Sequence, residues 1–131
     1  MWKHLPLSIH ENAAGAALAA EAARNQGKFW EYHDQLFANQ DKLGMDDLTQ
    51  YAKELRLDML RFEKDMLDPD TKKRIDADVA EARTLGVSVT PSTFINGRFV
   101  RGAQPFETFA KIIDEELTKL NLLVPSKPSS N

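Results

Sequence analysis

Pro91 lies between two short runs of residues that favour β-structure, at 87–90 and 92–95. Because proline has no N–H to donate to a sheet, it must open a strand or lie at a sheet edge. A cis Thr90–Pro91 bond would turn the chain sharply into the strand, at a cost of about 0.5–1 kcal/mol. A trans proline at the start of a strand is the commoner arrangement, and the residues alone leave both open.

A hairpin is predicted directly after this segment. Asn96-Gly97 is a strong hairpin signal, because a type I′ turn needs positive φ at both central positions. The run Arg98-Phe-Val-Arg101 then returns as the second strand.

The sequence contains no cysteine. This excludes thiol catalysis, disulfides, thiolate metal sites and covalent haem attachment for the chain itself. It does not indicate a compartment, because a cysteine-free chain is compatible with either redox environment.

The other residues capable of chemistry form no recognisable site. His4, His10 and His33, with Glu11 and Asp34, match no H-x-x-x-H or H-E-x-x-H pattern, so we expect no metal ligands. His33 falls on the apolar face of a predicted helix and is expected to be a hydrogen-bonded core histidine.

Two further groups of residues have ordinary structural interpretations. The adjacent carboxylates at 46–47 and 115–116 point in different directions on a helix and are expected to be solvated. Phe29, Trp30, Tyr32 and Phe37 are spaced for a helix, which favours a core role over a peptide-binding surface.

The composition is that of an ordinary globular domain. The chain has 131 residues, 42% of them hydrophobic and 28% charged, with a formal net charge of -3. Binding to nucleic acid or to an anionic membrane would require clustered Lys and Arg, and the charges here are interspersed. No apolar run is long enough to span a bilayer, and the first residues do not have the pattern of a signal peptide.

Hydrophobic periodicity predicts five successive helices before the hairpin and one after it. The first is Ala-rich and is expected to run from Asn12, as its N-cap, to Gly27. The third and fourth are expected to be capped by Asp46 and Asp58, the fifth to start at Asp68-Pro69-Asp70, and the last to open at Pro105. Residues 2–7 form a partly apolar run that predicts a short strand.

Taken together, these segments resemble the C-terminal part of DsbA-like thiol–disulfide oxidoreductases of the thioredoxin superfamily. The resemblance rests on Gly-Val-Ser-Val-Thr-Pro-Ser-Thr-Phe-Ile-Asn-Gly-Arg at 86–98 and Gly-Ala-Gln-Pro-Phe at 102–106. Lys-His-Leu-Pro-Leu at 3–7 is similar to the strand that follows the family's redox helix. The Ala-rich start of the helical region is similar to the family's helical insertion.

The resemblance implies a site without catalytic groups of its own. Pro91 matches the family's cis-proline, and Thr90 matches the preceding residue, whose backbone pairs with bound substrate peptide. Val89, Thr90 and Pro91 are therefore the expected substrate-binding residues; no catalytic residue, metal ligand or cofactor is expected. The family's C-x-x-C precedes the strand that matches residues 2–7, so this chain alone should be inactive, because thiol exchange needs sulfur.

The implied fold class is α/β, thioredoxin-like, with a helical insertion and without the N-terminal strand and redox helix. The expected parts are a remnant strand at 1–8, the helical insertion and following helix at 9–86, the C-terminal thioredoxin part at 87–122 and a disordered tail at 123–131. Without the family's central strand, the strand at 92–95 has an open edge, and open edges template association. A segment outside this chain, a rearranged strand or a second copy in a homodimer would each close it.

The expected function is protein disulfide exchange on cysteine-containing polypeptides, within a periplasmic or cell-envelope oxidoreductase that supplies the sulfurs. The alternative is a non-catalytic thioredoxin-fold module that binds peptides or dimerises. A C-x-x-C connected to this chain separates the two hypotheses.

Overall fold

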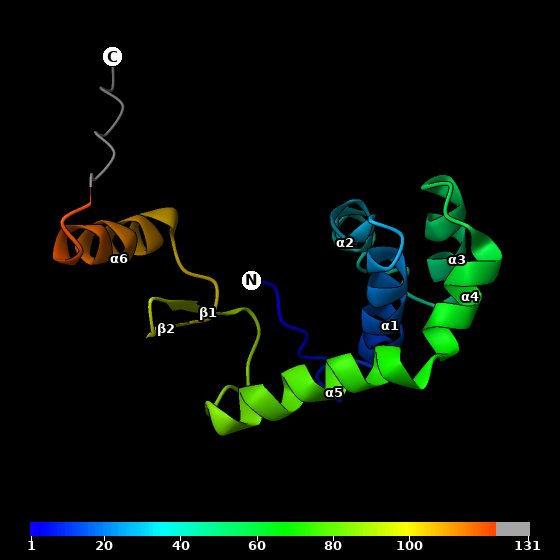
Figure 1. Ribbon diagram of the computed structural model, residues 1–131, viewed down its shortest axis with the longest axis horizontal. Helices are drawn as coiled ribbons and strands as arrows, with labels where there is room; N and C mark the ends of the chain where they lie inside the picture. The colour runs from blue at the N-terminus through cyan, green and yellow to red at the C-terminus, as the bar shows by residue number, and fades with distance from the viewer. Residues whose placement is uncertain (123–131) are drawn as a thin grey trace, which may run out of the picture. The chain divides into compact units, whose positions relative to one another are not determined.

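The computed structural model describes residues 1–122, which form two compact units (Figure 1). The first, called here the helical unit, is Met1–Gly86. The second, the hairpin unit, begins at Val87. The tail predicted to be disordered, residues 123–131, lies outside the described residues.

The helical unit contains five α-helices. They are α1 (Ala13–Arg24), α2 (Phe29–Ala38), α3 (Met45–Glu54), α4 (Met59–Leu67) and α5 (Pro69–Thr84). Helix α1 is the central element, because it packs against each of the other four. Among the described residues, no helix combines the length and the apolar character needed to cross a membrane.

The alanines of α1 allow the neighbouring helices to approach closely, and larger side chains complete the core. Ala19, Ala22 and Ala23 are completely buried, as are Phe62 of α4 and Tyr32 of α2. The Tyr32 hydroxyl donates a 2.7 Å hydrogen bond to the Leu48 carbonyl oxygen, so this buried polar group is satisfied.

The structure confirms the predicted cap at Asp58 and the predicted start of the fifth helix at Asp68-Pro69. Asp58 accepts a hydrogen bond from the Arg61 N–H at the start of α4, and Asp68 accepts one from the Asp70 N–H at the start of α5. Gly27, at φ 72°, takes the left-handed conformation that ends α1, where the Lys28 N–H bonds the Ala23 carbonyl oxygen.

The predicted cap at Asp46 is wrong, and Asn12 holds the N-cap position without capping through its side chain. Helix α3 begins at Met45, before Asp46, and its Asp47 side chain accepts the Gly44 N–H at 3.2 Å. The carboxylate one position further along the chain reaches back to the helix start, as in a capping box. Asn12 precedes α1, but its side chain makes no capping hydrogen bond.

The strand predicted at residues 2–7 is also wrong, because these residues form no strand in the structure. A strand needs a partner for its backbone groups, and the described part of the chain pairs nothing with this segment. The segment is held by side chains instead: the His4 N–H donates to the Asp78 carboxylate of α5 at 2.9 Å.

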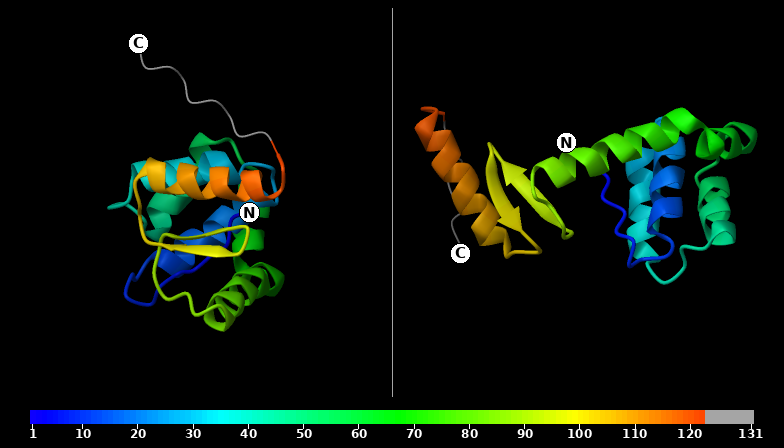
Figure 2. Two further views of the ribbon diagram at one scale, coloured as in Figure 1. Left: turned by 90° about the vertical axis from the view of Figure 1, so that its left-hand side faces the viewer. Right: turned by 90° about the horizontal axis from the view of Figure 1, so that it is seen from below.

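The hairpin unit consists of β1 (Ser92–Ile95), β2 (Arg98–Arg101) and α6 (Phe106–Lys119), as Figure 2 shows. The strands pair antiparallel, with Ile95 opposite Arg98 and Phe94 opposite Phe99. Asn96 and Gly97 have φ 48° and 84°, which confirms the predicted turn. The described residues thus contain a sheet of two strands, β1 and β2, each with one edge free of backbone partners.

Candidate functional site

The segment that contains Val89, Thr90 and Pro91 enters β1 in a conformation fixed by neighbouring groups. The Thr90–Pro91 peptide bond is cis. The Ser92 hydroxyl donates to the Val89 carbonyl oxygen at 2.6 Å, and the Gly102 N–H donates to the Pro91 carbonyl oxygen at 2.8 Å. The carbonyl groups on both sides of Thr90 are therefore already occupied.

Thr90 itself has an unused backbone donor and acceptor. Within residues 1–122, neither its N–H nor its carbonyl oxygen takes part in a hydrogen bond, and the residue is exposed. In an antiparallel pair, the N–H and C=O of one residue point to the same side and bond one residue of a neighbouring strand. The geometry thus suits the addition of an extended peptide at Thr90.

Glu116 connects the hairpin turn to α6. Its carboxylate accepts hydrogen bonds from Lys119 Nζ at 2.6 Å, Asn96 Nδ2 at 2.7 Å and Arg98 Nη1 at 3.3 Å. The bonds from Lys119, Asn96 and Arg98, against an opposing effect of burial, lower the pKa of Glu116 from 4.5 to about 2. These bonds fix the hairpin beside the helix.

This carboxylate makes the hairpin unit sensitive to acid. Because the folded-state pKa of Glu116 is depressed, its stabilisation is fully present above pH 4.5 and is lost as the pH falls towards about 2. We expect the Asn96 side-chain amide resonance, followed by NMR from pH 6 downwards, to titrate with a midpoint near 2. Glu116→Gln should remove that titration; a midpoint near the ordinary value of 4.5 would contradict the assignment.

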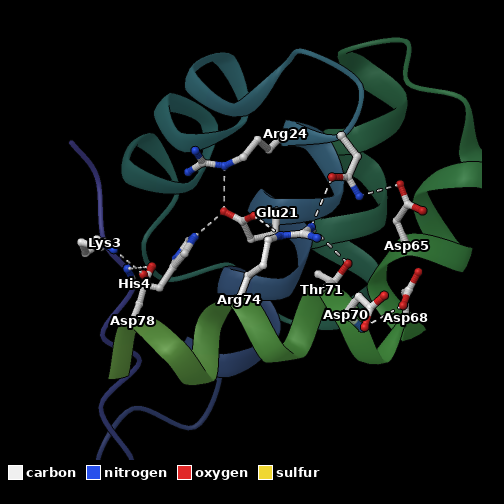
Figure 3. A network of polar contacts seen from close by, with 11 residues as sticks. Lys3, His4, Glu21, Arg24, Asp65, Asp68, Asp70, Thr71, Arg74 and Asp78 are labelled. Atoms are coloured by element: carbon white, nitrogen blue, oxygen red, sulfur yellow. Dashed lines mark hydrogen bonds and ion pairs between the residues drawn. The ribbon is translucent and has the colours of Figure 1, made fainter. Parts of the chain in front are cut away.

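A second polar site, in the helical unit, is centred on Glu21 (Figure 3). Glu21 is buried and binds three side chains: His4 Nε2 at 2.9 Å, Arg24 Nε at 2.8 Å and Arg74 Nε at 3.1 Å. Burial alone would raise the pKa of Glu21, but the hydrogen bonds from His4 and Arg74 and the charge of Arg24 outweigh it, so the pKa is lowered. The carboxylate is therefore held in its ionised form.

The Glu21 network continues on both sides. Lys3 Nζ lies 3.1 Å from Asp78 and 2.8 Å from Glu81, which ties the N-terminal segment to α5. Arg74 also donates to Asn25, whose amide reaches Asp65. The sequence interpretation missed this site. The sequence feature that could have indicated it is Glu21 itself, the one charged residue between Ala13 and Ala23.

The histidines differ in burial, and the prediction that His33 lies in the core is wrong, although its hydrogen bond is present. His4 is buried against Glu21, whereas His33 is partly exposed and bonds the neighbouring Asp34 at 2.9 Å. Among the described residues, no cluster of His, Asp and Glu has the arrangement of a metal site.

Comparison with known proteins identifies the family. The family model described as "Thioredoxin" matches residues 2–115. The chain belongs to the thioredoxin family. A solved thioredoxin-like oxidoreductase from Silicibacter pomeroyi superposes with a TM-score of 0.80 at 28% identity, over 88% of this chain and 66% of that one. The DsbA-like assignment and the thioredoxin-like α/β fold class are confirmed.

The curated relatives of this thioredoxin-family chain are much longer proteins. It is 45% identical over 114 residues to an Na(+)/H(+) antiporter of Salinispora tropica, and 38% identical over 112 residues to one of Herminiimonas arsenicoxydans. Each match covers 86% of this chain but 18% of the antiporter.

Proposed function

We propose that this chain is the substrate-binding part of a DsbA-like thiol–disulfide oxidoreductase, with Val89, Thr90 and Pro91 as its peptide-binding segment. The substrates are extended, cysteine-containing polypeptides, and the reaction takes place in the periplasm or cell envelope. Family membership and the solved oxidoreductase support the reaction class.

The observation that carries the proposal is the free backbone of Thr90. On this exposed residue, an unbonded N–H and carbonyl group, flanked by carbonyl groups that are already bonded, offer one residue of an extended peptide two hydrogen bonds. Main-chain bonds recognise any sequence, which suits an enzyme that must act on many unfolded polypeptides.

The sulfur chemistry must come from outside these 131 residues, which contain no cysteine. Thiol–disulfide exchange proceeds by attack of a thiolate on a disulfide sulfur, so the chain alone is expected to bind substrate without turning it over. The matching experiment is to isolate the polypeptide from its source cells, reduce it and alkylate it. Finding two alkylated thiols would support the oxidoreductase. Finding no alkylated thiol would support the alternative described next.

The alternative is a non-catalytic module that binds a peptide or a second copy of itself. The antiporter relatives favour it, because their names describe ion exchange and the matched region is a minor part of each. The free edge of β1 also suits self-association: residues 87–95 carry no charge, whereas β2 carries Arg98 and Arg101, which would repel their counterparts.

Peptide binding at Thr90 is tested by NMR of the labelled chain with a short, blocked, reduced Val-Cys-Val peptide. We expect the Thr90 amide to show the largest shift. Thr90→Pro removes the N–H and should weaken binding about fivefold, the value of one net hydrogen bond. Thr90→Val keeps the backbone and should bind as the parent does.

A peptide N-methylated at its cysteine gives a test that leaves the protein unchanged. It lacks the N–H that would donate to the Thr90 carbonyl oxygen. We therefore expect its affinity to be about fivefold lower, the value of one net hydrogen bond. Equal binding of both peptides would overturn the assignment. Shifts at Thr90 that follow protein concentration rather than peptide would support a homodimer through β1.

A further inference from the structure

An exposed aromatic and acidic stripe lies on α2 of the helical unit. Trp30, Asp34 and Phe37 follow one another at i, i+4 and i+7, which places them on one face of the helix. Trp30 is 58% exposed and Phe37 57%, and the Asp34 side chain is 80% exposed. The prediction that the aromatic residues of this helix form core is right for Phe29 and Tyr32 and wrong for Trp30 and Phe37.

Two further rings lie against the rings of this stripe. The His33 ring lies 5.3 Å from that of Trp30 and 4.4 Å from that of Phe37, measured between centroids. The Trp2 ring lies 6.1 Å from Trp30 and 4.8 Å from His33. Trp2, Trp30, His33, Asp34 and Phe37 are called here the α2 aromatic face, which contains both tryptophans of the chain.

The charge on this face selects a cationic partner. The Asp34 carboxylate has one oxygen, Oδ1, on His33 Nδ1 at 2.9 Å, which leaves its other oxygen for a new donor. Glu31, one turn away, adds a second carboxylate, which Lys28 partly compensates at 2.8 Å. Aromatic rings attract cations through their negative faces, so rings and carboxylate act in the same direction.

The chain already contains one contact between an arginine and an aromatic ring. The Arg24 guanidinium carbon lies 4.0 Å from the centroid of the Phe29 ring, which is itself 5.0 Å from the Trp30 ring. Arginine suits such a site better than lysine, because its planar guanidinium stacks on a ring while its N–H groups bond a carboxylate.

We propose that the α2 aromatic face binds an arginine side chain of a partner polypeptide. The guanidinium stacks on Trp30 and bonds Asp34, and an apolar residue beside the arginine packs against Phe37. This surface lies in the helical unit, whereas Thr90 belongs to the hairpin unit. A membrane surface is the less suitable occupant, because the carboxylates of Asp34 and Glu31 oppose an anionic bilayer.

The test uses three blocked peptides that differ in one residue: arginine, lysine or citrulline between two leucines. Both tryptophans report on the face, so fluorescence follows the titration directly. We expect the arginine peptide to bind about threefold more tightly than the lysine peptide and about tenfold more tightly than the uncharged citrulline peptide.

Variants assign the binding to the proposed groups. Trp30→Ala should weaken binding of the arginine peptide about tenfold. Asp34→Asn should weaken it about fivefold without affecting the uncharged citrulline peptide. Glu63→Gln is the matched control, because it removes one negative charge from an exposed position on α4. Its affinity should stay within about twofold of the parent's.

Several results would overturn the proposal. They are equal binding of the arginine and citrulline peptides, an unchanged affinity in Asp34→Asn, and binding to phosphatidylcholine vesicles in the absence of peptide binding. Self-association of the chain through Trp30, seen as fluorescence that depends on protein concentration and is lost in Trp30→Ala, would also overturn it.

Discussion

Replacing Glu21 by alanine is expected to destabilise the helical unit by about 3 kcal/mol. The substitution leaves the buried His4 ring without its partner, and it removes the acceptor shared by Arg24 and Arg74. Breaking a buried ion pair from one side costs about 3–5 kcal/mol. The low end applies here, because both arginine side chains are 45% exposed and regain hydration.

Urea unfolding of the full chain, followed by tryptophan fluorescence, measures this effect, because the Trp2 ring lies 6.2 Å from that of His4. Glu81→Ala is the matched control. Its carboxylate pairs with Lys3 at the surface, so its loss should cost about 0.5 kcal/mol or less. A loss in Glu21→Ala no greater than that in Glu81→Ala would show that the network contributes no more than a surface ion pair.

The helices and the hairpin could be predicted because they depend on local chemistry, which the sequence contains directly. Asp58 and Asp68 each precede a helical run, and each caps it through its own side chain. Asn96-Gly97 takes the two positive φ values that the turn requires. Such features depend on neighbours in sequence, and therefore no tertiary information is needed to predict them.

Apart from the cap of α3, where Asp47 takes the place of Asp46, the errors arise where a partner distant in sequence decides the outcome. Residues 2–7 have the composition of a strand, but their backbone bonds the Asp78 side chain because no strand pairs with them. Helical spacing shows that Trp30 and Phe37 share a face with each other, yet spacing does not say which faces are covered. Glu21 lies in an alanine-rich helix, and two of its partners, His4 and Arg74, are 17 and 53 positions away in the sequence.

The peptide site was predicted neither from local chemistry nor from tertiary contacts. Val89, Thr90 and Pro91 were predicted by resemblance to a family, and the family is now established. Their role in binding remains a proposal. What the structure adds is the reason that Thr90 is the residue to test: the carbonyl groups of Val89 and Pro91 are bonded, and its own backbone groups are not.

Replacing Phe62 by alanine is expected to cost the helical unit about 4 kcal/mol of unfolding free energy. Phe62 is completely buried, and its ring lies 5.8 Å from that of Tyr32. The cost of such a cavity depends on how far the surroundings can collapse into it. Here α4 packs on α1, whose buried alanines cannot extend into the space, and Tyr32 is held by its bond to Leu48.

Thermal and urea unfolding followed by circular dichroism measure this loss, with Phe106→Ala as the matched control. Phe106 is 78% exposed, so removing the same atoms there should change stability by about 0.5 kcal/mol or less. Phe62→Leu should fall between the two at about 1.5 kcal/mol, since it leaves a smaller cavity. Equal losses in Phe62→Ala and Phe62→Leu would mean that the helices close over the space, and that the alanine-rich packing of α1 is adaptable rather than rigid.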